Sequence, residues 1–316
     1  MEKQNLVIIS GPTAVGKTSL SIKLAKLING SIISADSMQV YKHMDIGSAK
    51  ITQEEMQGIK HYLIDVLEPE DEFNIATFKQ YAKNDIDLIN QDGKLPIIAG
   101  GTGFYIQSLL YDIDFNEVAS EDTEYREELA ELAKKYGASY IHNMLKEVDI
   151  KSAETIHPNN TKRVIRALEY YKLTGNKISD HNEEQKNKIS PYNFKYFVIN
   201  EDRNRLYKDI DGRVDIMIKN GLVDEVEYLK NRGLNIDHVS MQGLGYKEIL
   251  MYLDGKITLD EAVYIIKRDT RHFAKRQLTW FRREKDVIWI NKEDFLFDES
   301  KILEFMKEQL EGARII

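Results

Sequence analysis

The sequence predicts an α/β fold, in which a mostly parallel sheet carries helices on both faces and receives one all-helical insertion. Three observations support this prediction. Short apolar runs typical of buried strands alternate with helical patterns in the first third of the chain. A glycine-rich turn opens a helix directly after the first apolar run. A long middle stretch then lacks any convincing strand, and strand patterns resume at Lys195.

Six apolar runs have the length and composition of strands. They lie at Leu6–Ile9, Ser31–Ser34, Tyr62–Val66, Leu95–Ala99, Tyr196–Ile199 and Val287–Ile290. Between the first four runs, apolar periodicity predicts helices at Ser19–Ile28 and Ile75–Ile89. Strands that alternate with helices of this length are typical of parallel sheets, because each crossover places a helix on one face.

The middle stretch has helical patterns only. They lie at Glu121–Lys135, Ser139–Lys146 and Lys162–Leu173, the last of which is stopped by Gly175. A helical block between two strand-bearing parts is best explained as an insertion. We therefore expect a core domain formed by residues 1–114 and 191–316, with residues 115–190 inserted as a helical domain.

Composition limits the class of protein. The chain has 316 residues, 42% of them hydrophobic, which is enough for a full core. It has no cysteine, so disulfides, thiolate metal sites and cysteine nucleophiles are excluded, and its seven histidines show no metal-ligand spacing. It begins in a strand pattern without a basic leader, and no apolar run approaches membrane-spanning length. We expect a cytoplasmic protein without membrane contact, and we take it to be a monomer.

The glycine-rich turn matches the phosphate-loop (P-loop) pattern G-x-x-x-x-G-K-[ST] in the strand-to-helix context which that pattern requires. Its residues are Gly11, Pro12, Thr13, Ala14, Val15, Gly16, Lys17 and Thr18. The backbone N–H groups and the helix N-terminus favour an anion. Lys17 would reach a terminal phosphate, and the Thr18 hydroxyl would hold Mg²⁺. The sequence therefore predicts a P-loop NTPase-like sheet domain that binds a polyphosphate with Mg²⁺.

Two further predicted strands end in polar or glycine-rich segments. Asp36 follows the second strand, and Gly100–Gly103, which includes Thr102, follows the fourth. Because ligands of open parallel sheets bind beyond the carboxyl ends of the strands, we expect both segments to face the phosphate loop. Two alternatives stay open: Asp36 as a helix N-cap or Mg²⁺ ligand, and the glycines as a tight turn.

A strongly basic stretch contrasts with the net charge of −8. Eight cations and two acids lie between Lys267 and Lys285. Read as a helix, this stretch has Ile266, Phe273 and Trp280 on one side, and opposite them a basic arc formed by Arg268, Arg271, Lys275 and Arg282. We expect the apolar side to pack on the domain and the basic side to track an RNA backbone. A solvated basic face is the alternative.

The three strand-end segments, in this order and spacing, resemble those of the tRNA dimethylallyltransferases, also called tRNA isopentenyltransferases or IPP transferases. The resemblance extends from Leu6 to about Trp289. It includes Lys162–Glu169, Gly243–Glu248 and Ala274–Arg282. One departure is Asp209, which stands where we expect an arginine, so no phosphate contact is assigned there.

The resemblance implies a reaction. This family transfers the dimethylallyl group of dimethylallyl diphosphate to the exocyclic amine of the adenosine just 3′ of the tRNA anticodon. The phosphate loop, with Lys17 and Mg²⁺, would then stabilise the leaving diphosphate. Asp36 matches the family's candidate for the base that accepts a proton from the amine, and Thr102 would fix its geometry.

The resemblance also implies contacts with the tRNA anticodon stem-loop, whose target base must be turned out of its stack. The candidates are Asp36, Ser37, Met38, Gln39, Thr102, Arg126, Asn160, Thr161, Lys162, Arg163 and Arg213. Each has a plainer interpretation: Met38 as core, Gln39 as surface, and the arginines as ion-pair partners.

Two rival functions stay open at this stage. A small-molecule or nucleotide kinase would place ATP on Lys17 and Thr18, but it leaves the basic stretch and the helical insertion unexplained. A GTPase-type switch would read guanine through Asn291–Asp294, yet its companion motif occurs only at Asp209–Gly212, inside a helical pattern. A triphosphate would also satisfy the loop N–H groups, so incidental ATP binding is compatible with the sequence.

Overall fold

The computed structural model describes residues 3–113 and 123–316 of the chain. These residues form two compact units. The first is the core unit, formed by the chain up to Leu109 together with Pro191–Ile316, and the second is the helical unit, Leu110–Ser190. Within the described ranges, no helix is long and apolar enough to cross a membrane.

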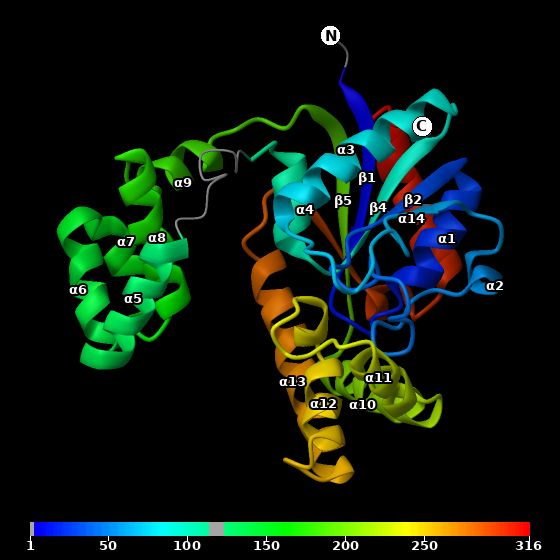
Figure 1. Ribbon diagram of the computed structural model, residues 1–316. Helices are drawn as coiled ribbons and strands as arrows, with labels where there is room; N and C mark the ends of the chain where they lie inside the picture. The colour runs from blue at the N-terminus through cyan, green and yellow to red at the C-terminus, as the bar shows by residue number, and fades with distance from the viewer. Residues whose placement is uncertain (1–2, 114–122) are drawn as a thin grey trace. The chain divides into compact units, whose positions relative to one another are not determined.

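The core unit contains a six-stranded sheet in the order β3-β2-β4-β1-β5-β6, and all its strand pairs are parallel (Figure 1). The strands are β1 (Gln4–Ser10), β2 (Gly30–Ser34), β3 (His61–Tyr62), β4 (Leu95–Gly100), β5 (Tyr192–Asn200) and β6 (Val287–Asn291). The predicted parallel α/β sheet is confirmed. The prediction was wrong about the length of β3, because Leu63 and Asp65 adopt left-handed backbone angles, with φ of 59° and 54°, that end the strand.

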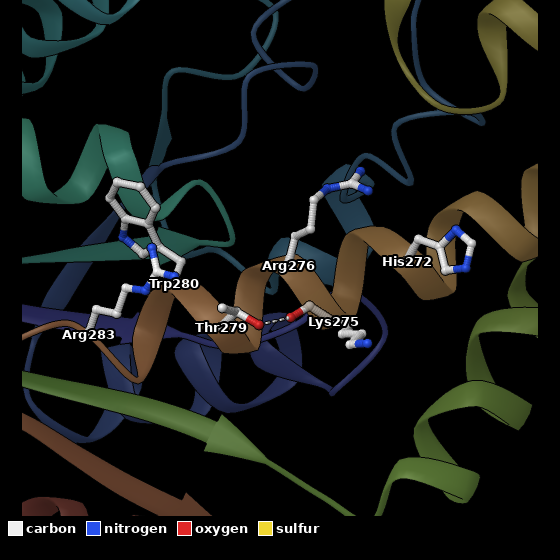
Figure 2. Close-up of a pocket in the computed structure, with 6 residues that line it drawn as sticks. All are labelled: His272, Lys275, Arg276, Thr279, Trp280 and Arg283. Atoms are coloured by element: carbon white, nitrogen blue, oxygen red, sulfur yellow. Dashed lines mark hydrogen bonds between the residues drawn. The ribbon is translucent and has the colours of Figure 1, made fainter. Parts of the chain in front are cut away.

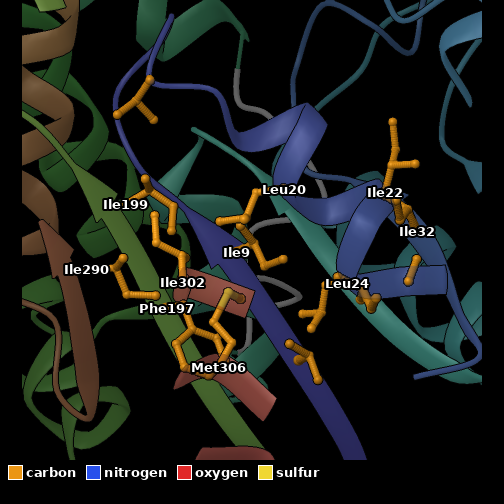
Figure 3. Close-up of a cluster of buried hydrophobic side chains, with 14 of the residues drawn as sticks. Ile9, Leu20, Ile22, Leu24, Ile32, Phe197, Ile199, Ile290, Ile302 and Met306 are labelled. Carbon is orange, nitrogen blue, oxygen red and sulfur yellow. The ribbon is translucent and has the colours of Figure 1, made fainter. Parts of the chain in front are cut away.

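Helices cover both faces of this sheet. On one face, α1 (Lys17–Leu27) and α14 (Glu299–Gly312) pack on strand residues such as Ile9 and Phe197 (Figure 3). The side chain of Ile8 points to the opposite face of the sheet from that of Ile9. It is also fully buried, as expected for a sheet that is covered on both faces. The helix α3 (Ile75–Gln91) contacts β2 and β4.

Four further helices of the core unit lie toward the carboxyl ends of the strands (Figure 1). They are α10 (Arg203–Lys219), α11 (Leu222–Asn231), α12 (Tyr246–Leu253) and α13 (Leu259–Phe281). The helix α4 (Gly103–Leu110) lies beside the sheet next to α3, and the short helix α2 (Gln53–Met56) lies at the side near α1 (Figure 1). The basic stretch lies on α13, which begins at a capping box formed by Thr258 and Glu261. The helix ends at Phe281, so the prediction of a helix to Lys285 was wrong. The chain turns there because β6 starts at Val287.

The helical unit contains α5 (Thr123–Tyr136), α6 (Ala138–Val148), α7 (Ile150–Thr155), α8 (Thr161–Thr174) and α9 (Ile178–Lys186). Leu129, Ile141 and Val164 are fully buried in its apolar core. Gly175 ends α8 in a left-handed conformation, with φ of 71°. The inserted all-helical part is thus confirmed, although the predicted start of its first helix at Glu121 lies outside the described residues.

Candidate active site

The phosphate loop connects β1 to α1 and has a strained backbone. Gly11 and Gly16 have φ of 148° and 89°, and Ala14 also lies in the left-handed region at 67°. A Cβ at Gly11 would fall 2.4 Å from the carbonyl oxygen of Ile199 on β5, so only glycine fits there. The neighbouring strand therefore fixes the shape of the loop.

Two cations converge on this loop. Lys17 donates from Nζ to the carbonyl oxygen of Pro12 at 2.7 Å. Arg213, from α10, has Nη1 at 3.4 Å from Oγ1 of Thr13. Burial lowers the pKa of Lys17 to about 7, and the charge of Arg213 acts in the same direction. Burial also lowers the pKa of Arg213, while the charge of Asp36 opposes this shift. The site therefore holds an excess of partly buried positive charge, which an anion would compensate.

A third cation, Lys292, supports the loop from the β6 side. Lys292 donates to the carbonyl oxygen of Val15 at 3.2 Å and pairs with the buried carboxylate of Glu201 at 2.9 Å. It belongs to the segment that matched the guanine-reading pattern. Asn291 in that segment donates to Asp294 at 3.1 Å. These contacts give the segment a role in supporting the phosphate loop.

Asp36 and Thr102 are held side by side by the adjacent strands β2 and β4. Ala35 donates to the carbonyl oxygen of Ala99 at 2.8 Å, and Thr102 donates its backbone N–H to Ala35 at 3.2 Å. Asp36 itself accepts from the N–H of Met38 at 2.9 Å through Oδ1, which orients the carboxylate. A Cβ at Gly100 would lie 2.3 Å from the Ala35 oxygen, so glycine is required for this close approach.

Gln277 is a site residue that the sequence did not reveal. It lies on the side of α13 predicted to be apolar, and it is buried. Its Oε1 accepts from the N–H of Thr13 at 2.9 Å, and its Nε2 donates to the carbonyl oxygen of Gly101 at 3.0 Å. The Thr13 N–H, which we expected to face a phosphate, is thus taken by Gln277. A polar residue within an apolar helical stripe was the signal that could have identified it.

Several of these residues line one cavity of about 490 Å³ in the core unit. Its polar wall includes Thr13, Asp36, Ser37, Thr102, Arg213, Lys247, Arg276 and Gln277. Its apolar wall includes Ile210, Val214, Met217, Ile266 and Phe273 from α10 and α13. The predicted apolar side of α13 therefore lines the cavity as well as packing on the domain. The arrangement can bind an anion at one end and an apolar group beside a carboxylate.

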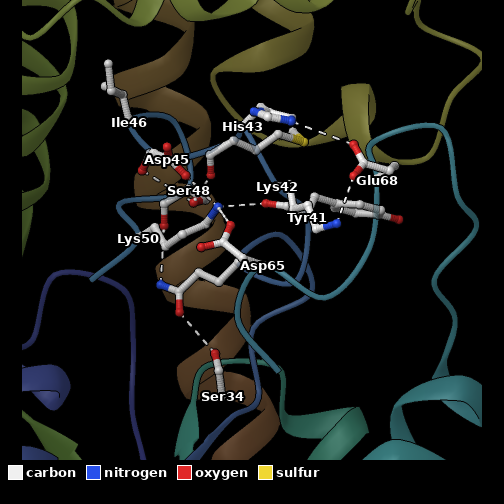
Figure 4. Close-up of polar contacts among 12 residues, drawn as sticks. Ser34, Tyr41, Lys42, His43, Asp45, Ile46, Ser48, Lys50, Asp65 and Glu68 are labelled. Carbon is white, nitrogen blue, oxygen red and sulfur yellow. Dashed lines mark hydrogen bonds and ion pairs between the residues drawn. The ribbon is translucent and has the colours of Figure 1, made fainter. Parts of the chain in front are cut away.

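The segment after Asp36 is anchored by its own polar contacts. The Gln39 amide accepts from Ser34 Oγ at 3.0 Å and donates to the carbonyl oxygen of Ala49 at 3.4 Å, so it is used within the loop. Lys50 donates to Tyr41, Asp45 and Asp65 at 2.6–2.7 Å (Figure 4). Ser37 and Met38 line the cavity.

Glu225, from α11, holds the same segment from the other side. Its carboxylate accepts the backbone N–H groups of Asp45, Ile46 and Gly47 at 2.9, 2.7 and 3.0 Å. It also accepts the hydroxyl of Tyr246 at 2.8 Å. Burial and this carboxylate raise the pKa of Tyr246 well above its usual value. Gly47 lines the cavity, so Glu225 shapes one of its walls.

The basic arc on α13 is partly neutralised. Arg268 pairs with Asp269 at 2.8 Å, and Arg271 pairs with Asp211 of α10. Lys275 and Arg282 are exposed. A second cavity, of about 390 Å³, is lined by His272, Lys275, Arg276, Thr279, Trp280 and Arg283 (Figure 2). The exposed positive charge is thus concentrated in the C-terminal half of the helix.

The predicted RNA contacts of the helical unit fall into two groups. Arg126 makes two hydrogen bonds to the buried carboxylate of Glu169, at 3.0 and 2.9 Å. Asn160 caps α8 by accepting from the N–H of Arg163 at 3.4 Å. At the start of α8, Thr161 is half-buried, whereas the side chains of Lys162 and Arg163 are exposed. Asp209, the departure noted above, is exposed on α10.

The residues at the start of α1 could hold a divalent cation together with a bound phosphate. Among the described residues, no cluster of three histidine or acidic side chains could hold a metal by itself. Thr18 is exposed at the start of α1 and offers one hydroxyl. Magnesium commonly takes one or two protein ligands and completes its shell with substrate phosphates and water, so this donor set is compatible with it.

The fold and the site define a P-loop protein with a partly buried cationic anion site, an adjacent carboxylate and an apolar wall. A family model described as IPP transferase matches residues 39–284. A tRNA dimethylallyltransferase of Lachnoclostridium phytofermentans is 62% identical over 304 residues, which cover 96% of this chain and 97% of that protein. The chain therefore belongs to the IPP transferase family.

Solved structures agree with this assignment. The full-length tRNA isopentenylpyrophosphate transferase of Bacillus halodurans is 44% identical, with a TM-score of 0.74, and the match covers 99% of this chain and 98% of that one. A eukaryotic dimethylallyltransferase acting on tRNA is 30% identical, with a TM-score of 0.76, over 91% of this chain and 74% of that one. The similarity thus spans both the core unit and the helical unit.

Proposed function

We propose that the chain transfers the dimethylallyl group of dimethylallyl diphosphate to the exocyclic amine of the adenosine 3′ of the anticodon in tRNA. The observation that carries the proposal is the cavity of the core unit. It combines the phosphate loop, Asp36 and Thr102 with an apolar wall. A five-carbon apolar group attached to a diphosphate matches these two kinds of surface.

The donor diphosphate would bind the phosphate loop, where Lys17 and Arg213 supply positive charge. Both cations lose favourable hydration through burial, so they interact strongly with an incoming anion. The dimethylallyl group would lie along Val214, Ile266 and Phe273. A divalent cation, Mg²⁺ in our proposal, would be held by the Thr18 hydroxyl, diphosphate oxygens and water, and would neutralise part of the diphosphate charge.

The acceptor amine would face Asp36 and Thr102. As the nitrogen forms its bond to the first carbon of the dimethylallyl group, the carbon–oxygen bond to the diphosphate breaks. The electron pair of that bond leaves with the diphosphate oxygen, beside Lys17 and Arg213. The amine proton passes to the Asp36 carboxylate, which contributes about 10²–10⁴-fold to the rate if it acts as a general base.

The RNA would be held by exposed cations. Lys275, Arg276 and Arg283 lie together on the second half of α13 and just after it. Lys162 and Arg163 offer a further pair in the helical unit. A tRNA substrate implies work in the cytoplasm, and we propose that the protein acts there as a monomer.

Mass spectrometry of nucleosides tests the proposal. Unmodified tRNA with adenosine 3′ of the anticodon is incubated with the protein, Mg²⁺ and dimethylallyl diphosphate, without ATP. We expect a gain of one five-carbon unit on adenosine, formed about 10²–10⁴-fold more slowly with Asp36→Asn. If adenosine gains no mass and ATP is instead consumed when it is supplied, the proposal is wrong and a kinase becomes the better interpretation.

A further inference from the structure

Gln277 makes two hydrogen bonds that leave no ambiguity about its orientation. Its partners are both backbone groups: the N–H of Thr13, which can only donate, and the carbonyl oxygen of Gly101, which can only accept. The amide oxygen must therefore face Thr13 and the amide nitrogen must face Gly101. A side chain without an amide cannot make both contacts.

The two partners belong to the two loops that carry the reacting groups in the proposed function. Thr13 lies in the phosphate loop after β1, and Gly101 directly precedes Thr102 after β4. These strands are neighbours, and Ser10 donates from Oγ to the carbonyl oxygen of Gly100 at 2.6 Å where their pairing ends. Gln277 extends this connection beyond the sheet, into the loops themselves.

The glycine at position 101 is explained by the same contact. A Cβ there would lie 2.2 Å from Nε2 of Gln277, far inside the closest approach of real atoms. No positive φ is recorded for Gly101, so its backbone does not need glycine for conformational reasons. The pair Gly101 and Gln277 is therefore a matched unit, in which the missing side chain of one makes room for the amide of the other.

We propose that Gln277 is a positioning residue, which sets the phosphate loop relative to Thr102 and thereby aligns the donor carbon with the acceptor amine. This inference rests on the proposed function, because the alignment concerns its two substrates. Gln277 does not exchange a proton or an electron pair with either substrate. Because a misplacement of about 1 Å can lower a rate by about 10²-fold, loss of this bridge should act mainly on kcat.

The first test replaces the amide by side chains of similar size. Gln277→Met removes both hydrogen bonds, and Gln277→Glu keeps only the acceptor for Thr13. We expect each to lower the single-turnover rate of transfer by about 10–10²-fold, while the Kd of tRNA changes by less than about threefold. Gln107→Met is the matched control. The Gln107 amide donates to Glu284 at 3.0 Å, and Gln107 does not line the cavity.

The second test uses the matched pair. Gly101→Ala should impair transfer as strongly as Gln277→Met, because the added methyl group displaces the amide. When Gln277→Ala is already present, adding Gly101→Ala should lower the transfer rate by less than about threefold, because the methyl group no longer meets the amide. Melting temperatures measured in parallel identify any variant that fails to fold, and the double variant remains informative if Gly101→Ala alone unfolds.

The outcomes separate this inference from the proposed function. If the wild-type protein transfers no dimethylallyl group to tRNA, the proposed function fails first. If it does, and Gln277→Met transfers within threefold of wild type, the positioning role is wrong. Independent, multiplicative effects of Gly101→Ala and Gln277→Ala would overturn it as well.

Discussion

The partly buried Lys17 ammonium should make donor binding depend on pH. Its pKa is lowered to about 7, so about half of the lysine is uncharged at pH 7 before the diphosphate arrives. The anion favours the charged form and raises this pKa, so binding takes up a proton. Above pH 7 the KM of dimethylallyl diphosphate should therefore rise about tenfold for each pH unit, until the pKa of the bound state is reached. Below pH 7 it should be flat.

The assay is the KM of dimethylallyl diphosphate at saturating tRNA, between pH 6 and 9. The charge of the diphosphate itself also changes with pH. The KM of the wild-type protein at each pH is therefore divided by the KM of Lys17→Met, which cancels the contribution of the substrate. The increase from pH 7 to pH 9 should approach about 50-fold in this ratio, because half of the lysine is already uncharged at pH 7. Isothermal calorimetry in two buffers should show uptake of about one proton at pH 8.5. A ratio that stays flat up to pH 9 would refute the lowered pKa of Lys17.

Three further predictions follow from the contacts described. Asp36→Asn keeps an acceptor for the Met38 N–H but cannot take a proton, so kcat should fall by about 10²–10⁴-fold while donor affinity changes little; a near-normal single-turnover rate would contradict its role as base. Lys275→Gln should reduce the slope of log Kd for tRNA against log salt concentration by about one, whereas Lys307→Gln on α14 should leave the slope unchanged. An unchanged slope for Lys275→Gln would show that Lys275 does not contact the RNA. Glu225→Gln should lower the unfolding free energy by about 1–3 kcal/mol in urea melts, because an amide cannot accept from all the donors around it, whereas the exposed Glu227→Gln should be neutral.

Much of the fold could be predicted because it depends on local patterns. The strand-to-helix motif located the phosphate loop, and the rule that strand ends converge in a parallel sheet brought Asp36 and Thr102 to the same edge. β3 was overestimated because periodicity does not reveal the left-handed residues Leu63 and Asp65. The end of α13 was misplaced for a similar reason, since a helical pattern continues past Phe281 although the chain turns into β6.

The missed residues depend on contacts between distant segments. Gln277 meets Thr13 across 264 positions and Gly101 across 176, a pairing that periodicity cannot detect. Glu225 is one of several acids on a surface helix until the structure brings it to the N–H groups of Asp45, Ile46 and Gly47. The basic arc was overestimated because the carboxylate of Asp211, on another helix, neutralises Arg271.

A phosphate loop binds charge, and the rest of the cavity decides which bond breaks. In a kinase the nucleophile attacks phosphorus, so the acceptor must lie close to the loop. Here Val214, Ile266 and Phe273 form an apolar wall that suits a hydrocarbon attached to the diphosphate. With Asp36 beside that wall, an attack on carbon leaves the whole diphosphate as the departing group on the loop. The same cations that bind the donor then stabilise the charge it gains as it leaves, which is why one loop can serve two classes of reaction.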